Sequence, residues 1–284
     1  MNKILLFLLF IVPLHASKKH YPLTNEPIDV VLVTHPKDKV ALQLCIKGIR
    51  NYGENIGRVI VVSSEPLSDD AEWFNEKLYP FSKDDVALEI GRGDPQVRDA
   101  FFNRGGHPVG WFYQQLLKLY AAYVIPDISS NILVLDSDSV FISDIAFLNR
   151  QHGGLLCIKS KNPTKSHYVQ HAIRMLPSYH PIYPEYNSVN HHMLFQKPIL
   201  DDLFQEIEEH RQLPLWKVFC REVDITRKFG SGSEYELYFN FALNHTSQVS
   251  IREIHRRASA DFSKINLYKS LGYELVSFHS YMRK

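Results

Sequence analysis

The chain has 284 residues, a formal net charge of +1 and 45% hydrophobic residues. This length and composition are typical of one large globular domain or two small ones. The small net charge argues against an anionic membrane surface as the main partner, and we expect no nucleic-acid partner. Its three cysteines are too few and too widely spaced for a disulfide or metal-binding framework.

The N-terminus has the pattern of a secretory signal peptide. A basic start precedes an apolar run from Ile4 to Leu14, and the small residue Ala16 follows. Because the run is shorter than the roughly 20 residues that span a bilayer, we expect cleavage near Ala16. We therefore expect a signal peptide over 1–16 and a single domain over 17–284 without a transmembrane segment. The mature chain would lie in the lumen of the secretory pathway or be exported, unless the apolar start remains as a weak membrane anchor.

The first half of the chain has the pattern of an α/β fold. Apolar runs at 28–35 and 58–65 predict buried strands, and the spacing of apolar residues over 38–51 predicts a helix between them. This order favours a parallel sheet covered by helices. Residues 66–109 are less regular and suggest one or two short elements and a loop. A strong helix is predicted at 111–124, before Pro126.

The second half continues this pattern without an internal repeat or a linker. Its long segment 161–187 is rich in Pro, Tyr and His, which favours a loop. The remaining predicted elements are strands at 132–135, 153–160, 190–195 and 274–281 and helices at 198–211 and 233–244.

The strand at 132–135 ends in two carboxylates, Asp136 and Asp138. Residues two apart in an extended segment project to the same side, so both carboxylates can reach one ion. A hard divalent cation, Mn²⁺ or Mg²⁺, takes oxygen ligands and leaves room for a substrate's phosphates. An Asx-type turn at a strand end is the structural alternative. Because ligands of parallel sheets bind beyond the carboxyl ends of the strands, the pair suggests a site for a cation and a diphosphate.

This strand, its Asp-x-Asp and the following Val140-Phe141 resemble the metal site of GT-A-fold glycosyltransferases, which use nucleotide-diphosphate sugars. The segments 33-VTHPKD-38 and 110-GWFYQQLLKLYAA-122 are similar to further parts of that fold. So is 187-NSVNHHMLF-195, although it lacks the glycine of the family's Asn-x-Gly strand. The chain is most similar to a little-characterised group of predicted glycosyltransferases with Gly-Trp-x-x-Gln-Gln and Ser-Glu-Tyr-Glu patterns. The resemblance implies a GT-A fold with a mainly parallel central sheet flanked by helices, a nucleotide-diphosphate sugar as donor, and a glycan, lipid or protein acceptor.

The helix at 111–124 has three polar or aromatic candidates on one face. Trp111, Gln114 and Lys118 are spaced at i, i+3 and i+7. Lys118 is suited to balance a diphosphate, and Gln114 to hydrogen-bond a sugar hydroxyl. A solvated polar face is the alternative.

The helix at 233–244 opens with two acidic residues in different expected roles. Ser233 and Glu236 have the spacing of a capping box. Glu234 is not needed for the cap, and we expect it to be the general base that deprotonates an acceptor hydroxyl in an inverting transfer. In a retaining transfer Glu234 would instead orient the sugar. The structural alternative is a carboxylate favoured by the helix dipole.

Two histidines are candidates, the first because of the resemblance and the second because of its place on a strand. A histidine near the end of the chain often completes the metal site of GT-A enzymes, and His279 matches that place; a core histidine is the alternative. His191 and His192 are neighbours on a predicted strand, so at most one faces the cleft, and His192 is the candidate.

The end of the first strand would contact the nucleotide. Thr34 and His35 lie where the base and ribose are expected. Asp38 could reach the same place, or it could cap the helix that follows.

Two other functions compete with a metal-dependent glycosyltransferase. In a haloacid-dehalogenase-like phosphatase, Asp136 would be the nucleophile and Asp138 the acid/base, with Mg²⁺. That fold usually carries the motif on its first strand and needs a later acidic pair at a strand end, whereas Asp201 and Asp202 begin a predicted helix. The other alternative is a catalytically inactive module that binds a sugar or a nucleotide. We expect the transferase, in which the cation bridges Asp136, Asp138 and the diphosphate.

Overall fold

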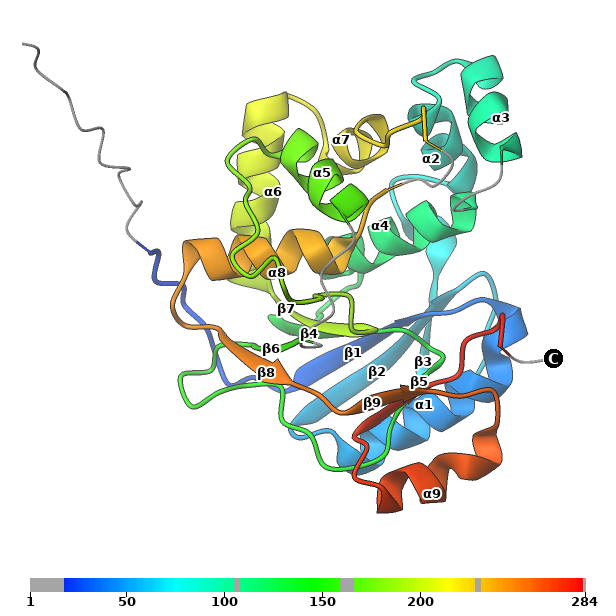
Figure 1. The fold of residues 1–284 in the computed structure, drawn as a ribbon, viewed down its shortest axis with the longest axis vertical. Coiled ribbons are helices and arrows are strands. Elements are labelled where there is room, and N and C mark those ends of the chain that lie inside the picture. The colour runs from blue at the N-terminus through cyan, green and yellow to red at the C-terminus, as the bar shows by residue number, and fades with distance from the viewer. Residues whose placement is uncertain (1–17, 105–107, 159–165, 228–230, 283–284) are drawn as a thin grey trace, which may run out of the picture.

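The centre of this computed structural model is a five-stranded sheet in the order β3-β2-β1-β4-β7 (Figure 1). The structure describes residues 18–104, 108–158, 166–227 and 231–282. Strands β1 to β4 run parallel, and β7 pairs antiparallel with β4. The predicted α/β class with a mainly parallel central sheet is therefore confirmed. The five strands are β1 (Ile28–Val33), β2 (Ile56–Ser63), β3 (Glu72–Asn75), β4 (Asn131–Leu135) and β7 (His192–Gln196).

Helices cover both faces of this sheet, with α1 on one face and α4, α6 and α8 on the other (Figure 1). The helices are α1 (Lys39–Tyr52), α2 (Lys83–Ile90), α3 (Pro95–Asn103), α4 (Val109–Val124), α5 (Ser166–Met175), α6 (Lys197–Arg211), α7 (Leu215–Arg221), α8 (Glu234–His245) and α9 (Ile265–Ser270). Three short 3₁₀ turns are η1 (Pro36–Asp38), η2 (Glu76–Leu78) and η3 (Phe262–Lys264).

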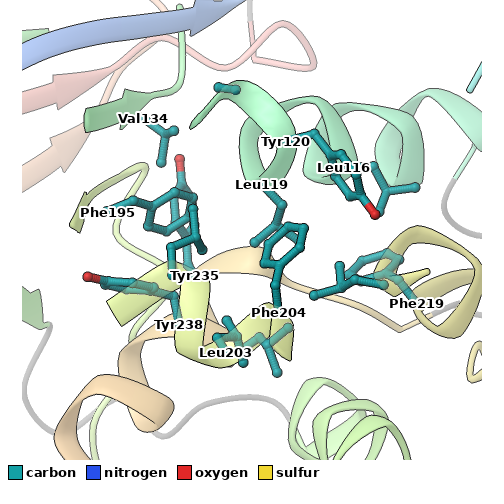
Figure 2. Packing of buried hydrophobic residues seen from close by; sticks show 14 of the residues in the cluster. Leu116, Leu119, Tyr120, Val134, Phe195, Leu203, Phe204, Phe219, Tyr235 and Tyr238 are labelled. Atoms are coloured by element: carbon teal, nitrogen blue, oxygen red, sulfur yellow. The ribbon is translucent and has the colours of Figure 1, made fainter. Parts of the chain in front are cut away.

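The central stretches of β1, β2 and β4 are apolar because their alternating side chains enter two separate hydrophobic clusters. In β1, Val31 and Val33 pack into the cluster that includes α4, whereas Leu32 packs into the cluster that includes α1. Figure 2 shows part of the first cluster, where Tyr120 of α4 meets Phe204 of α6 with ring centroids 5.1 Å apart. Burial on both faces is the physical reason that these strands appear as continuous apolar runs in the sequence.

Two smaller sheets extend the fold beside the central one. The first has the order β5-β10-β9, with β5 (Ser139–Phe141), β10 (Leu275–Ser277) and β9 (Arg256–Ala258). The second pairs β6 (Leu155–Ile158) with β8 (Ser250–Glu253). In the antiparallel pair β5–β10, Ser139 lies opposite Ser277. The segment that enters β5 and the segment that leaves β10 therefore lie side by side.

Several segments differ from the sequence-based prediction. Residues 66–109 contain β3, η2, α2 and α3 rather than one or two short elements. Part of the predicted loop 161–187 is helix α5, whose Tyr168, Ala172 and Met175 are buried at helical spacing. Helices α7 and α9 and strands β5, β8 and β9 were not predicted. The expected signal peptide over 1–16 lies outside the described residues, and no helix among those described is long and apolar enough to cross a membrane.

The strand order creates a switch point between β1 and β4. From β1 the chain builds β2 and β3 on one side, and it then returns to place β4 on the other side of β1. The connections that leave the carboxyl ends of β1 and β4 therefore diverge, and ligands of open α/β sheets bind in the crevice between such connections.

Candidate functional site

A cavity of about 320 Å³ lies at this switch point. It is lined by the segments that follow β1, β2 and β4 and by one face of α4. Five residues predicted to bind a nucleotide or sugar line it: Thr34, His35, Asp38, Trp111 and Gln114. Its other polar lining residues include Lys37, Ser64, Glu76, Lys83 and Ser137. The structure thus brings together side chains from both halves of the predicted site.

Two cavity residues are tied to neighbouring backbone. Gln114 Nε2 donates to the carbonyl of Val33 at 3.5 Å, at the end of β1. Trp111 Nε1 donates to the carbonyl of Gly232 at 3.3 Å, in the segment that precedes α8. Helix α4 therefore connects the cavity to the start of α8.

Lys118 lies behind the cavity in a buried ionic cluster. Its side chain is 2% exposed, and its ammonium forms ion pairs with Asp136 and with Glu234, the latter at 2.9 Å. It also donates to the hydroxyl of Tyr235 at 3.0 Å, and that hydroxyl donates to Asp136 Oδ1 at 2.9 Å. An ammonium has three donors, so every hydrogen of Lys118 is used within the protein. This placement differs from the expected contact between Lys118 and a diphosphate.

The opposite charges of this cluster shift the pKa values of its members toward their ionised forms. Burial alone would lower the pKa of Lys118, but Asp136 and Glu234 outweigh burial and hold it above its ordinary value. Burial would raise the pKa of Asp136, but the ammonium of Lys118 and the contact with His191 hold it below its ordinary value. Burial raises the pKa of Glu234, and Lys118 offsets this only in part. Lys118 is therefore protonated and Asp136 ionised at neutral pH.

Glu234 is completely buried at the start of α8. Its Oε1 accepts from Lys118, and its Oε2 has no hydrogen-bond partner among the described residues. The neighbouring cap is only half of the predicted capping box. Ser233 Oγ accepts from the backbone of Glu236 at 3.3 Å, but the Glu236 carboxylate turns inward to Tyr179, at 2.7 Å. In this conformation, buried polar contacts hold the first turn of α8 on both sides.

Asp138 and His279 form a second pair beside the first. The β5–β10 pairing brings them together, and Asp138 Oδ2 lies 3.2 Å from His279 Nδ1. This distance is that of a hydrogen bond between the two side chains, and a carboxylate and an imidazole are both groups that Mn²⁺ accepts as ligands. Among the described residues, no three His, Cys, Asp or Glu side chains form a group that could hold a metal ion. The pair fits a cation that is bound by few protein groups and by phosphate oxygens, as is usual for Mg²⁺.

Of the two adjacent histidines, His191 is the residue at this site. Its Nδ1 lies 2.9 Å from Asp136 Oδ2, and its ring centroid is 4.9 Å from that of His279. The structure places His192 in the core instead, with its ring against Phe141 and its pKa lowered by burial to about 3. His192 is the first residue of β7, and its ring also packs against Phe147.

The sequence-based prediction did not include His191 or Tyr235, although both contact Asp136. Tyr235 lies inside the quoted Ser-Glu-Tyr-Glu pattern, so its position beside Glu234 was an available signal. His191 has a positive φ of 65°, which no periodicity rule foresees in a predicted strand.

The chain was compared with curated proteins, solved structures and protein-family models. No curated protein matches the sequence. Solved structures similar to the chain include mouse xyloside xylosyltransferase 1 in its apo form, with 12% identity and a TM-score of 0.42, over 91% of this chain and 99% of that one. A similarity of this degree carries no argument about activity. The model of a family of unknown function, DUF6492, matches residues 14–271, and the chain belongs to this family.

Proposed function

We propose that this chain is a metal-dependent glycosyltransferase, which moves a sugar from a nucleotide-diphosphate donor to an acceptor hydroxyl. One observation carries the proposal: a cavity at the switch point of a parallel sheet adjoins Asp138 and His279, a carboxylate and an imidazole that could both bind a divalent cation. A nucleotide in the cavity would extend its diphosphate toward that pair, because Ser137 lines the cavity and the next residue is Asp138.

The residues around the cavity would bind the donor. Thr34, His35 and Asp38 follow β1 and would contact the nucleoside. Trp111 and Gln114 face the same cavity from α4 and would contact the base or the sugar. Asp138 and His279 would hold the cation. When bound, the cation would neutralise the charge that develops on the leaving diphosphate.

Glu234 is the proposed base for the acceptor hydroxyl. Its burial raises its pKa, which is the direction that a general base at neutral pH requires. Its Oε2 is available to accept a proton, since no described residue donates a hydrogen bond to it. Because the side chain has no exposed surface, an acceptor would reach it only after the segment that opens α8 moves.

The contacts of Asp136 favour this function over a phosphatase that uses Asp136 as a nucleophile. Both of its oxygens are engaged, Oδ1 with Lys118 and Tyr235 and Oδ2 with His191. A carboxylate held in this way is suited to position other side chains. An attacking nucleophile would have to break these contacts.

The test is a donor assay on the purified protein. We expect the protein to release a nucleoside diphosphate from one of a panel of nucleotide sugars only when Mn²⁺ or Mg²⁺ is present, and Asp138→Asn to abolish the release. The matched control is Asp144→Asn, the same change at an exposed aspartate beyond β5, which should leave release intact. No release from any donor, together with metal-dependent cleavage of a phosphate monoester, would replace the transferase by the phosphatase.

A further inference from the structure

We propose that Glu76 binds the Watson–Crick edge of the donor's base and selects guanine, so that the donor is a guanosine diphosphate sugar. The inference rests on the proposed function, because it names the base of the donor for the same cavity. Glu76 was not among the sequence-based candidates, because it lies in the irregular segment 66–109. The structure places it in the lining of the cavity.

The strand order separates Glu76 from the proposed cation site. Glu76 follows β3, whereas Ser137 follows β4, and both residues line the cavity. Strands β1 and β2 lie between β3 and β4 in the sheet, and neighbouring strands are about 4.8 Å apart, so three spacings of about 14 Å in total separate the two residues. The phosphates, ribose and base of an extended nucleoside diphosphate cover such a span. A diphosphate beside Asp138 therefore leaves the base beside Glu76.

The backbone around Glu76 is held in place by the elements next to it. The pairing of β2 with β3 places Asn75 opposite Ser63. Asn75 Oδ1 accepts from the backbone N–H of Lys77 at 3.0 Å, and the carbonyl of Glu76 accepts from the hydroxyl of Tyr113 at 3.5 Å. Tyr113 belongs to α4 and lines the same cavity. Two walls of the cavity thus fix the position of Glu76.

The Glu76 carboxylate is close to charged cavity residues but is bonded to none of them. Burial raises the pKa of Glu76, and the charges of Lys83 and His35, which line the same cavity, oppose this shift. Within the described part of the chain, the carboxylate accepts no hydrogen bond and forms no ion pair. An ionised carboxylate only accepts hydrogen bonds. A ligand at this end of the cavity should therefore present N–H or O–H donors to it.

Guanine is the base whose edge matches such an acceptor. Its N1–H and its N2 amino group are adjacent donors, so both carboxylate oxygens can accept at once, as they do from arginine. Uracil presents one N–H between two carbonyl oxygens, which a carboxylate repels. Adenine and cytosine each present an amino group beside a ring nitrogen that is itself an acceptor. With these three bases an acceptor on the base would face the carboxylate, which lowers their affinity.

Calorimetric titration of the purified full chain with GDP, UDP, ADP and CDP, each with Mg²⁺, tests the assignment. The wild type should bind GDP at least about tenfold more tightly than the other three, because they leave a carboxylate oxygen unpaired. Glu76→Gln replaces one acceptor by a donor that opposes the donors of guanine. It should weaken GDP binding by about tenfold or more, and binding of the other three by less than about threefold.

The matched control is Glu65→Gln. Glu65 is an exposed residue that follows β2, next to the cavity residue Ser64, and it is not among the described residues that line the cavity. The change removes the same charge at the same edge of the sheet, so it measures the effect of charge alone. The preference for GDP should remain.

The outcomes separate this inference from the proposed function. If the wild type binds UDP, ADP or CDP as tightly as GDP, or if Glu76→Gln weakens all four equally, the assignment of Glu76 to guanine is wrong and the donor cavity stands. If the protein prefers GDP through Glu76 but releases it from no guanosine diphosphate sugar, the base assignment stands and the transferase is overturned. If no nucleotide binds, both proposals are overturned.

Discussion

Replacing Lys118 by methionine should lower the free energy of unfolding by about 3 to 5 kcal/mol at neutral pH. Methionine is close to lysine in length and is apolar, so the packing volume is largely kept and the loss is electrostatic. The ammonium is 2% exposed and is the counter-ion of both Asp136 and Glu234. Without it, two carboxylates remain at a site that water reaches poorly, which is the costly way to break a buried ion pair.

The deficit of Lys118→Met should depend on pH in a defined direction. In the variant, the completely buried Glu234 has lost its counter-ion, so its folded-state pKa lies above the unfolded value. Its contribution to stability is present below the unfolded pKa and is lost as the pH rises through the folded pKa. In the wild type, the pKa of Asp136 is lowered, so its contribution is lost as the pH falls. The two stability curves should therefore converge on acidification toward pH 4.

Urea unfolding followed by circular dichroism at several pH values measures this difference. The matched control is Lys197→Met, because Lys197 pairs with Asp201 at i,i+4 and is 37% exposed. Its loss should cost less than about 0.5 kcal/mol. A Lys118→Met protein within about 1 kcal/mol of the wild type at pH 7 would refute the reasoning, as would a deficit that does not shrink on acidification.

Two further substitutions test the core and the cavity. Gly153→Ala should destabilise the fold by about 1 to 3 kcal/mol, measured as a lower Tm, because the added Cβ would lie 1.9 Å from the carbonyl oxygen of Gln248; an unchanged Tm would contradict the close approach. Trp111→Ala should weaken binding of a nucleoside diphosphate by about tenfold in calorimetry, because it removes an aromatic surface from the cavity. Trp111→Phe should retain most of the affinity, and equal affinity of Trp111→Ala and wild type would contradict the proposed role.

The central sheet could be predicted from the sequence because its strands are buried on both faces. Continuous apolar runs such as that of β4 then mark strands directly. Helix α5 was missed because prolines, tyrosines and histidines around it suggest a loop, while its buried apolar residues include Tyr168, Ala172 and Met175. The weaker signal was present, but the composition of the surrounding segment outweighed it.

The pairing within the candidate site could not be predicted in the same way. Glu234 and Lys118 are 116 residues apart in sequence, and neither residue contains a local signal that it is buried against the other. An acidic residue at a helix start is favourable in water, so the sequence also fitted an exposed Glu234. The choice between His191 and His192 depended on one left-handed backbone conformation that pattern rules do not foresee.

The pairing of β5 with β10 brings Asp138 and His279 together only in the folded chain. Asp138 and His279 are 141 residues apart in sequence, so the unfolded chain does not hold them at a common point. A cation that binds the pair should therefore stabilise the native state, by about 2.7 kcal/mol at one hundred times its Kd. For a chain of this size that is a rise in Tm of roughly 4 to 5 °C. Melting curves with a series of divalent ions, and with a chelator, can thus rank the ions before any sugar donor or acceptor is known.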